Sequence, residues 1–466
     1  MGEVRILLKC RDIPDYDELK VYEAHGGYQA LRKALQMERQ AVIEEVKKSG
    51  LRGRGGAGFP AWIKWNGLPK DDEKPHYVLC NSDEGEPGTF KDFELMYRAP
   101  HLLVEGMIIA GYAVRARTGY IYIRGEYVEC ARKVRKAIDQ AYAAGYLGKN
   151  ILGSGFDHDI YIHMGAGSYE CGEESAMMSS LMGERGMPRL KFPHAPLPTV
   201  AGLWDCPTLI NNCETLCCVP HIILNGGEWY AQYGASTKNS RGTKIFSVSG
   251  HVNKPGNYEV EFGTPLMELI EMAGGVAGGK LKGIIPGGSS MPILPADKCE
   301  DAIIGYEELM EKGSMVGSGG CIVLNEHTCI VHFAWRTAEF YAHESCGKCT
   351  PCREGTRWMV QILERILQGK GRMEDIDLLL EICNHIDGRS FCALGDAAAW
   401  PIRAFIKNYR EEFEYFIRHG RSMYADNPIS QTMFPPKGYR RYDPMRYEYT
   451  YGSLLRTAPS SPASIP

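Results

Sequence analysis

Four cysteines form the strongest chemical pattern in the sequence. Cys346, Cys349 and Cys352 recur at every third position in ESCGKCTPCREG, and Cys392 follows well downstream in RSFCALGD. Three thiolates at this spacing can converge from a tight turn, and a distant fourth completes the coordination of a [4Fe–4S] cluster. All-cysteine zinc sites usually consist of two separated C-x2-C pairs, and a redox dithiol needs no third cysteine. The pattern therefore favours an iron–sulfur cluster, with zinc as the alternative.

Cys383 is the competing candidate for the fourth ligand. Ile382 and Ile386 lie beside it at helical spacing, which favours a buried helix thiol over a metal ligand. The chain has 16 cysteines in 466 residues, which is too sparse for a disulfide scaffold. The remaining cysteines, most of them scattered singly, are interpreted as buried structural thiols.

A glycine-rich loop at Arg52–Phe59 (RGRGGAGF) matches G-x-G-x-x-G literally. The match to a dinucleotide fingerprint is weak, because a helix and not a strand precedes the loop and Pro60 follows it. Backbone without side chains can nevertheless approach a flat ring or a phosphate closely, and Arg54 and Lys64 supply charge nearby.

Three further polar segments lie in the same region of the chain. The loop at 165–174 (GAGSYECGEE) leads from an expected strand into a helix, where free backbone N–H groups could meet an anion, or where its glutamates could simply complement the helix dipole. The acidic loop at 81–88 (NSDEGEPG) is as compatible with a solvated loop as with a ligand site. The amides of Asn211 and Asn212 could bind a heterocycle or cap the following helix.

These loops must be positioned by an alternation of strands and helices. Strands are expected at 76–80, 120–124 and 159–164, and helices at 100–116, 127–144 and 173–183. Such alternation predicts an α/β domain with a mainly parallel sheet, on which ligands gather at the loops after the strands' carboxyl ends. Short β-like runs after residue 240 predict a small β-grasp-like domain, and long amphipathic runs near the C-terminus predict a helical bundle. The expected domains are a lead-in at 1–45, the α/β domain at 46–238, the β-grasp-like domain at 239–333, the bundle at 334–420 and an extended tail at 421–466.

Composition excludes several classes of protein. The net charge of −4 and a pI of about 6.4 give no basic field for nucleic acid. The best apolar stretch, Leu102–Val114, is too short to span a bilayer and is interrupted by Glu105. The N-terminus lacks the features of a secretory signal, so the protein is expected on the cytosolic side. The tail at 421–466 is rich in Tyr, Arg and Pro, which favours contact with a partner over a core of its own.

Six segments together resemble the flavoprotein subunit of bacterial and mitochondrial complex I, the respiratory NADH:quinone oxidoreductase. They are SGLRGRGGAGFP, KPHYVLCNSDEGEPGTFKD, GAGSYECGEES, INNCETL, ESCGKCTPCREGT and SFCALGD, in the order of the family. The resemblance implies a non-covalent FMN in a Rossmann-like α/β domain, a β-grasp (ubiquitin-like) domain, and a C-terminal four-helix bundle that carries a [4Fe–4S] cluster. It also implies NADH as the hydride donor and no obligatory catalytic acid or base on the protein.

The resemblance also assigns residues. The expected FMN contacts are Gly53, Arg54, Gly55, Lys64, Asn81, Asp83, Glu84, Tyr169, Gly172, Glu173, Asn211, Asn212 and Thr215. The expected NADH contacts are Phe59, Glu86 and Glu174. The expected cluster ligands are Cys346, Cys349, Cys352 and Cys392.

The sequence departs from the family pattern at two places. Gly67 occupies a position that often holds an aromatic or bulky residue, where the family stacks the adenine. The loop that usually reads KPPFPA-x-x-G is longer here (LKFPHAPLPTVAG), and Phe192 and His194 are the candidates for its stacking ring. Both departures concern NADH affinity more than flavin binding.

The implied partners are a small [2Fe–2S] subunit and a large multi-cluster iron–sulfur subunit, in the peripheral arm on the cytoplasmic side of the inner membrane. One alternative is the diaphorase subunit of an NAD-linked hydrogenase or formate dehydrogenase. Those subunits often carry extra N-terminal cysteine motifs, which residues 1–45 lack. A second alternative, of another class, is an iron–sulfur scaffold that no longer binds NADH, and a structural-zinc module is the weakest.

Overall fold

A four-stranded parallel sheet organises the first half of the molecule. The computed structural model describes residues 3–191 and 193–424. The strands are β1 (Tyr77–Ser82), β2 (Thr118–Ile123), β3 (Asp159–Met164) and β4 (Thr208–Asn212), in the spatial order β3-β2-β1-β4. All neighbours run parallel. The first three strands confirm the sequence prediction, whereas β4 was not predicted because it is short, almost wholly buried and without alternation.

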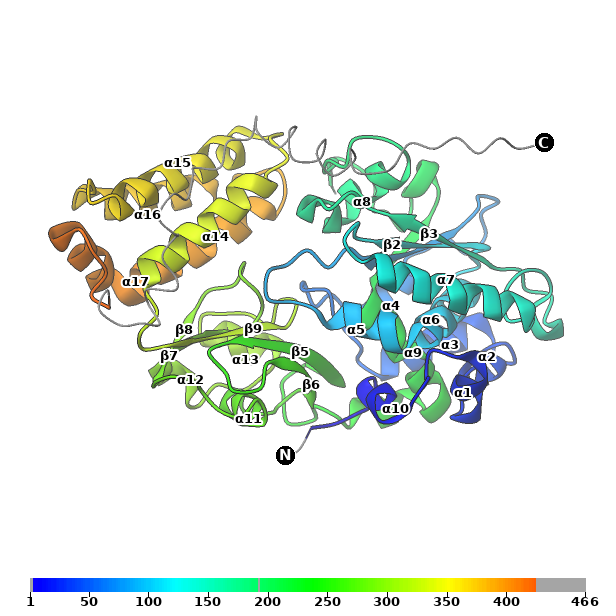
Figure 1. Cartoon of the computed structure of the whole chain (residues 1–466). Coiled ribbons are helices and arrows are strands. Elements are labelled where there is room, and N and C mark those ends of the chain that lie inside the picture. The colour runs from blue at the N-terminus through cyan, green and yellow to red at the C-terminus, as the bar shows by residue number, and fades with distance from the viewer. Residues whose placement is uncertain (1–2, 192, 425–466) are drawn as a thin grey trace, which may run out of the picture.

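Helices cover both faces of this sheet (Figure 1). Alternate residues of β1 face opposite layers, so that Val78 and Cys80 pack with α6 (Pro100–Ala113), α7 (Val128–Ala143) and α9 (Cys213–Asn225). Leu79 instead packs against α8 (Glu174–Leu181). The shorter helix α5 (Lys91–Arg98) follows the loop after β1. Helix α6 is buried on nearly all sides, which explains why its apolar run resembles a membrane segment in the sequence.

The N-terminal residues pack onto this layer as short helices. They form η1 (Leu8–Asp12), α1 (Leu19–Ala24), α2 (Gln29–Ala34), α3 (Arg39–Lys48) and α4 (Ala61–Asn66). Glu105 of α6 is buried and accepts hydrogen bonds from the backbone N–H groups of Tyr28 and Leu31, both at 2.9 Å. The carboxylate that interrupts the apolar run therefore anchors the N-terminal helices.

A second, five-stranded sheet follows. Its order is β6 (Gly256–Glu261), β5 (Thr243–Gly250), β9 (Gly320–Asn325), β7 (Leu281–Ile285) and β8 (Leu294–Pro295). Strands β5 and β9 are parallel and the other pairs are antiparallel. Helix α11 (Leu266–Met272) packs against this sheet, and the helix and the sheet share an apolar core. The short helices α10 (Gly227–Ala231), α12 (Ala296–Cys299) and α13 (Tyr306–Glu311) complete the region.

Four helices end the described chain. They are α14 (Ile330–Glu344), α15 (Thr350–Leu367), α16 (Glu374–Ile386) and α17 (Leu394–His419), and they pack around a separate core above the second sheet in Figure 1. The predicted fold class, with its parallel sheet, second sheet and C-terminal helices, is confirmed. None of the described helices combines the length and apolar character needed to cross a membrane. Most of the predicted tail, from residue 425 onward, lies outside the described residues.

Candidate functional site

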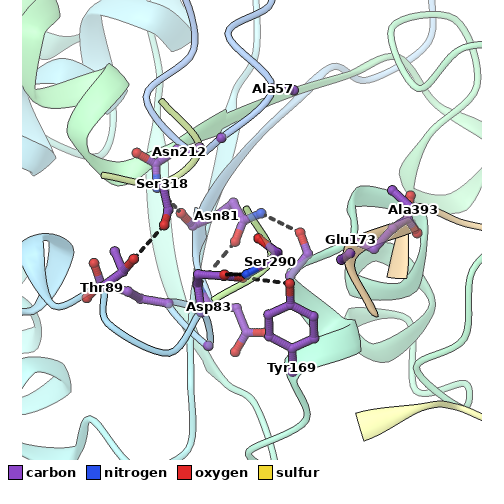
Figure 2. A pocket seen from close by; sticks show the side chains of 18 of the residues that line it. Ala57, Asn81, Asp83, Thr89, Tyr169, Glu173, Asn212, Ser290, Ser318 and Ala393 are labelled. Atoms are coloured by element: carbon purple, nitrogen blue, oxygen red, sulfur yellow. Dashed lines mark hydrogen bonds between the residues drawn. The ribbon is translucent and has the colours of Figure 1, made fainter. Parts of the chain in front are cut away.

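A cavity of about 400 Å³ lies at the carboxyl ends of the parallel strands. Strand order reverses between β1 and β4, because β2 and β3 extend to one side of β1 and β4 lies on the other. Ligands of open α/β sheets bind at such a switch point. Asn81 and Asn212, at the ends of β1 and β4, both line the cavity (Figure 2), and the Asn212 amide donates to the backbone oxygen of Asn81 at 3.3 Å.

All three parts of the molecule contribute walls to this cavity. The second sheet supplies Ser290 and Ser318, and the start of α17 supplies Leu394 and Trp400. The residues predicted from the sequence that line it are Gly55, Asn81, Asp83, Glu84, Glu86, Tyr169, Gly172, Glu173 and Asn212. The volume falls within the range of small-molecule and cofactor sites.

Glycines let the segments that form the cavity wall pack closely on one another. A Cβ at Gly55 would lie 3.1 Å from Cβ of Asn212, and one at Gly85 would lie 3.1 Å from Cδ2 of Tyr169. At Gly172 it would lie 3.3 Å from the backbone oxygen of Asp83. A side chain at any of these positions would press on the neighbouring wall segment, so glycine fits the close approach of the two.

The acidic loop after β1 places three carboxylates around the cavity. Glu84 accepts hydrogen bonds from the backbone N–H groups of Asp92 and Phe93, at 2.8 and 3.0 Å, and so caps α5. Burial, reinforced by Asp92, raises the pKa of Glu84 to about 8. Burial likewise raises the pKa of Asp83 to about 7 and that of Glu86 above its ordinary value. Oδ2 of Asp83 is buried without a hydrogen-bond partner among the described residues. The solvated-loop interpretation is therefore wrong for this segment.

Glu86 ties two other parts of the molecule to this loop. Its carboxylate accepts from the Tyr169 hydroxyl at 2.7 Å and from the backbone N–H of Ser290 at 2.8 Å (Figure 2 shows the pocket around Tyr169 and Ser290). On the far side, Glu173 caps α8 by accepting from the N–H groups of Ser175 and Ala176, at 3.0 and 2.9 Å. Asn212 similarly caps α9 through the N–H of Glu214 at 3.0 Å. The capping interpretation is thus confirmed for Asn212, while Glu173, predicted only to complement the helix dipole, is also a cap; both residues line the cavity.

Several predicted residues lie outside the cavity wall: Gly53, Arg54, Phe59, Lys64, Glu174, Asn211 and Thr215. The Arg54 guanidinium is buried and donates to the backbone oxygens of Arg241 and Thr243, at 2.6 and 3.0 Å. Its charge therefore does not reach the cavity directly, although Gly55 beside it does. The Arg54 N–H donates to the Thr215 hydroxyl at 2.9 Å, and Asn211 accepts from Trp65 at 2.9 Å. These residues support the wall from behind.

Lys64 and Glu174 form a partly exposed ion pair at 3.0 Å. Phe59 is 46% exposed. Gly67 ends α4 and is exposed, and His194 is exposed as well, while Phe192 lies outside the described residues. The residues predicted for the nucleotide side thus remain accessible, with Glu86 alone among them on the cavity wall.

Sequence reasoning missed a buried lysine on the wall. Lys91 follows the acidic loop in the motif TFKD, so the signal was present but was not used. Burial opposes its charge, but Asp92 and Glu214 outweigh burial and raise the pKa of Lys91. The other unpredicted lining residues include neighbours of predicted ones and residues from distant segments: Gly56, Ala57, Gly85, Thr89, Asp92, Glu170, Ser290, Met291, Met315, Gly317, Ser318, Ala393, Leu394, Ala397 and Trp400.

The four predicted cysteines line one small hollow beside this cavity. Cys346, Cys349 and Cys352 come from the turn before α15 and its first residues, and Cys392 comes from the loop before α17. Among the described residues, no three His, Cys, Asp or Glu side chains are arranged to hold a single metal ion. Four thiols around a common hollow are the donor set of a [4Fe–4S] cluster, so the residues fit that group.

Contacts around the hollow involve the sulfur atoms themselves. The N–H of Phe391 donates to Sγ of Cys349 at 3.4 Å, and the Ser345 hydroxyl lies 3.1 Å from Sγ of Cys352. Burial raises the pKa of Cys346, Cys352 and Cys392, so these thiols are protonated in the free chain and binding of metal releases protons. Cys383 is fully buried, does not line the hollow and lies 3.6 Å from Sδ of Met359.

Models of protein families match three regions of the chain. A Nuo51 FMN-binding domain covers residues 46–221, an SLBB domain covers 244–323, and an NADH-ubiquinone oxidoreductase-F iron-sulfur binding region covers 332–416. A relative from Rhizobium meliloti, an NADH-quinone oxidoreductase F subunit, is 51% identical over 89% of this chain and 98% of its own length. The chain belongs to the family of NADH-quinone oxidoreductase F subunits. Most of the residues that line the cavity belong to the FMN-binding region of this family, and all four cysteines lie in its iron–sulfur region.

Other similarities agree with this membership. The NADH-quinone oxidoreductase F subunit of Mycobacterium bovis is 51% identical over 88% of this chain and 92% of its own. A crystal structure of an NAD+-reducing [NiFe]-hydrogenase in the air-oxidized state superimposes with a TM-score of 0.77 at 33% identity, covering 89% of this chain and 67% of that one. The H2-reduced form gives a TM-score of 0.79 at 31% identity, over 95% of this chain and 72% of that one.

Proposed function

We propose that this chain is the NADH-oxidising flavoprotein subunit of an NADH:quinone oxidoreductase, complex I. It takes hydride from NADH onto FMN and passes electrons singly to a [4Fe–4S] cluster. The observation that carries the proposal is the contiguity of two sites. Glu170 and Leu394 line both the cavity of the FMN-binding region and the cysteine hollow of the iron–sulfur region.

In this proposal the cavity holds the flavin through backbone and polar groups. The side-chain-free backbone at Gly55, Gly85 and Gly172 lies against the ring system and its phosphate chain, and Asn81 and Asn212 border it. Gly53, Arg54, Asn211 and Thr215 act from behind, by fixing the loop and the strand ends that carry these contacts. Lys64 and the pair of Glu173 and Glu174 border the opening.

FMN, when bound, accepts a two-electron hydride and releases electrons one at a time, which is the chemistry that a one-electron cluster needs. The chain's own residues supply positioning and exclusion of water, not acid or base catalysis. Tyr169 is held by its hydrogen bond to Glu86, and Glu86 by Ser290, so the wall that faces the nicotinamide is fixed by a three-residue chain. Phe59, Glu86 and Glu174 contact NADH, and Phe192 or His194 supplies the stacking ring of the longer loop.

The four cysteines then hold the cluster next to the flavin. A [4Fe–4S] cluster held by these cysteines would supply one-electron acceptance beside the cavity, and a further acceptor would dock outside the chain. We assign that role to a small [2Fe–2S] subunit and a large multi-cluster subunit, in a peripheral arm on the cytoplasmic side of the membrane. The support for an assembly is family membership, since the relatives are named as subunits.

The deciding experiment is an anaerobic titration of the purified chain with NADH, followed in the flavin absorbance band. We expect one FMN and four irons per chain, and bleaching of the band by NADH. A flavin that dithionite reduces but NADH does not would overturn the proposal and favour the scaffold alternative. The departures at Gly67 and His194 would then be the first residues to exchange for aromatic ones.

A second candidate is the diaphorase subunit of an NAD-linked hydrogenase, favoured by the similarity to the two hydrogenase structures. Affinity purification of the chain from its own cells separates the two. Recovery of quinone-reducing partners supports complex I, and recovery of a nickel-containing subunit supports the hydrogenase.

A further inference from the structure

A buried ionic network lies directly behind the cavity wall. Lys91 at the start of α5, Glu214 at the start of α9 and Lys244 on β5 are all at most 1% exposed. One carboxylate oxygen of Glu214 lies 3.0 Å from Nζ of Lys91 and 2.9 Å from Nζ of Lys244. The other accepts from the backbone N–H of Ile245 at 2.9 Å. A single carboxylate therefore joins two lysines and the backbone of β5.

The two lysines reach the cavity by different routes. Lys91 lines the cavity and lies 2.7 Å from Asp92 and 3.3 Å from the Asn212 side chain. Lys244 crosses from the second sheet to the α/β domain, where its Nζ donates to the backbone oxygen of Arg54 at 3.1 Å. That oxygen belongs to the glycine-rich loop, and the next residue, Gly55, is on the cavity wall.

Lys91 is the one cation among the described residues that line the cavity, beside six acids: Asp83, Glu84, Glu86, Asp92, Glu170 and Glu173. The Arg54 guanidinium is directed away from it, to Arg241 and Thr243. Lys91 shares the Glu214 carboxylate with Lys244, so Lys244 offsets part of the negative charge that faces Lys91. In a low-dielectric interior, loss of the Lys244 charge would therefore destabilise negative charge placed in the cavity beside Lys91.

Packing alone does not require these charges. Burial lowers the pKa of Lys244 to about 8, although its ammonium form still predominates at neutral pH. Buried ion pairs can often be replaced by apolar residues of similar volume at no cost in stability, because desolvation offsets their attraction. A Met–Leu contact would join β5 to α9 as well. An apolar contact would supply neither the charge beside the cavity nor the hydrogen-bond donor to the backbone oxygen of Arg54.

We propose that Lys244 is a positioning residue for the FMN site: its ammonium fixes the glycine-rich loop and, through Glu214 and Lys91, stabilises the reduced flavin. This inference rests on the proposed function, because it takes the cavity as the FMN site. It assigns a role in the flavin chemistry to a residue of the second sheet, outside the region matched by the FMN-binding family model. Charge near a flavin tunes its electronic properties.

The test compares flavin midpoint potentials in full-length variants, measured by anaerobic redox titration. Lys244→Met should lower the potential and raise the Kd of FMN by about tenfold, less than the complete loss of a buried charge pair would cost, because Glu214 keeps Lys91 as a partner. Glu214→Gln should raise the potential, since it removes negative charge. The double variant Lys244→Met/Glu214→Gln should return close to the parent, and Lys244→Arg should retain the parent potential.

A second buried lysine provides the matched control. Lys282 pairs with Glu412 at 2.6 Å, has a side chain that is only 7% exposed, and does not line the cavity. Lys282→Met should lower the melting temperature without changing the flavin potential or the Kd of FMN. If the Lys244→Met variant does not retain flavin, its midpoint potential cannot be measured. The expected rise of the potential in Glu214→Gln then remains as the readout.

Two results would overturn the inference. One is a parent-like potential and Kd in Lys244→Met. The other is a shift of the same sign in Lys244→Met and Glu214→Gln, which would indicate disturbed packing and not charge. The variant Gly55→Val changes the cavity wall itself. It distinguishes failure of the inference about Lys244 from failure of the proposed function. If Gly55→Val keeps FMN with parent affinity, the flavin is elsewhere; if it loses FMN while Lys244→Met behaves like the parent, only the role of Lys244 fails.

Discussion

Asp83 and Glu84 stand out among the residues of the cavity because burial raises their pKa values to about 7 and about 8. At pH 6 both are mostly protonated, and by pH 9 both carry charge. FMN and NADH are anionic, so ionisation of these residues opposes their binding. We expect KM for NADH to rise between pH 7 and pH 9, measured with an artificial electron acceptor. Asp83→Asn should flatten this rise, and a pH profile identical to the parent would contradict the assignment.

The same shifts predict how stability depends on pH. Both folded pKa values lie above the ordinary carboxyl values, so the folded chain keeps protons that the unfolded chain releases. The contribution of these residues to the free energy of unfolding is therefore full below about pH 4 and falls as pH rises towards about 8. Urea midpoints of the parent and Asp83→Asn should differ more at pH 8 than at pH 5, with the variant the more stable. Equal differences at both values would be inconsistent with a raised pKa of Asp83.

Cys383 and Cys392 provide a clean comparison at the residue scale. Cys392→Ala should abolish the cluster, because the hollow then offers three thiols in place of four. Cys383→Ala removes a buried thiol outside the hollow and should cost about 1–2 kcal/mol of stability as a small cavity while leaving iron content unchanged. Iron analysis and low-temperature EPR of the reduced chain measure both. Loss of the cluster in Cys383→Ala, with the cluster retained in Cys392→Ala, would make Cys383 the ligand and Cys392 the structural thiol.

The sequence predicted residues well where their chemistry depends on local spacing. The four cysteines are found around one hollow, as their spacing required. Arg54 was expected beside the flavin phosphate, but its guanidinium points to Arg241 and Thr243, which are close only in the folded chain. Lys91 was overlooked because its partners Asp92 and Glu214 make a buried lysine possible, and Glu214 is remote in sequence.

At the scale of elements, helix starts carry much of the cavity wall. Glu173 begins α8 and satisfies two N–H groups that would otherwise lack partners. Glu173→Ala should lower the free energy of unfolding by about 0.5–2 kcal/mol, the usual effect of losing an N-cap, and should weaken FMN binding. Glu184→Ala, which removes an exposed ion pair with Arg189, is the control and should change stability by less than about 0.5 kcal/mol. Chemical denaturation with and without added FMN measures both effects. Parent-like stability of Glu173→Ala would contradict the capping contribution, and an unchanged stabilisation by FMN would contradict a role in binding.

Elements with strong periodicity were predictable, and short buried ones were not. Strand β3 was predicted with the bounds it has, because β-branched and aromatic residues fill it. Strand β4 was read only as a pair of amides before a helix. It gains its strand geometry from pairing with β1, which no local signal reports. This missed strand creates the switch point at which the cavity lies.

At the scale of the whole molecule, the sequence predicted three folded parts but not their meeting at one cavity. Each part has its own hydrophobic core, formed by a separate set of buried residues. Their contacts depend on single residues such as Glu86 and Ser290, which lie far apart along the chain. Such pairs carry no periodic signal, so the composite wall could be recognised only in three dimensions.

The tail after Tyr424 provides a test of assembly. Ser422 is buried and Tyr424 lies over Lys282, so a deletion should begin at Ala425. We expect removal of 425–466 to leave FMN and iron content unchanged but to reduce recovery of partner subunits in affinity purification. A chain in which the tail tyrosines are replaced by serine keeps the length and isolates the contribution of the rings. Full recovery of partners by the deletion variant would show that the tail has no docking role.

The wall formed by Ala393–Trp400 has a consequence for how the protein is made. The glycine-rich loop leaves the ribosome early, whereas the last wall of the cavity comes from the start of α17, close to the end of the described chain. Domains fold in the order of synthesis, at about 5–20 residues per second. The cavity therefore closes only after the start of α17 has been synthesised. Flavin insertion becomes a late step of maturation, and a truncated chain that lacks α17 is left with an incomplete cavity for FMN.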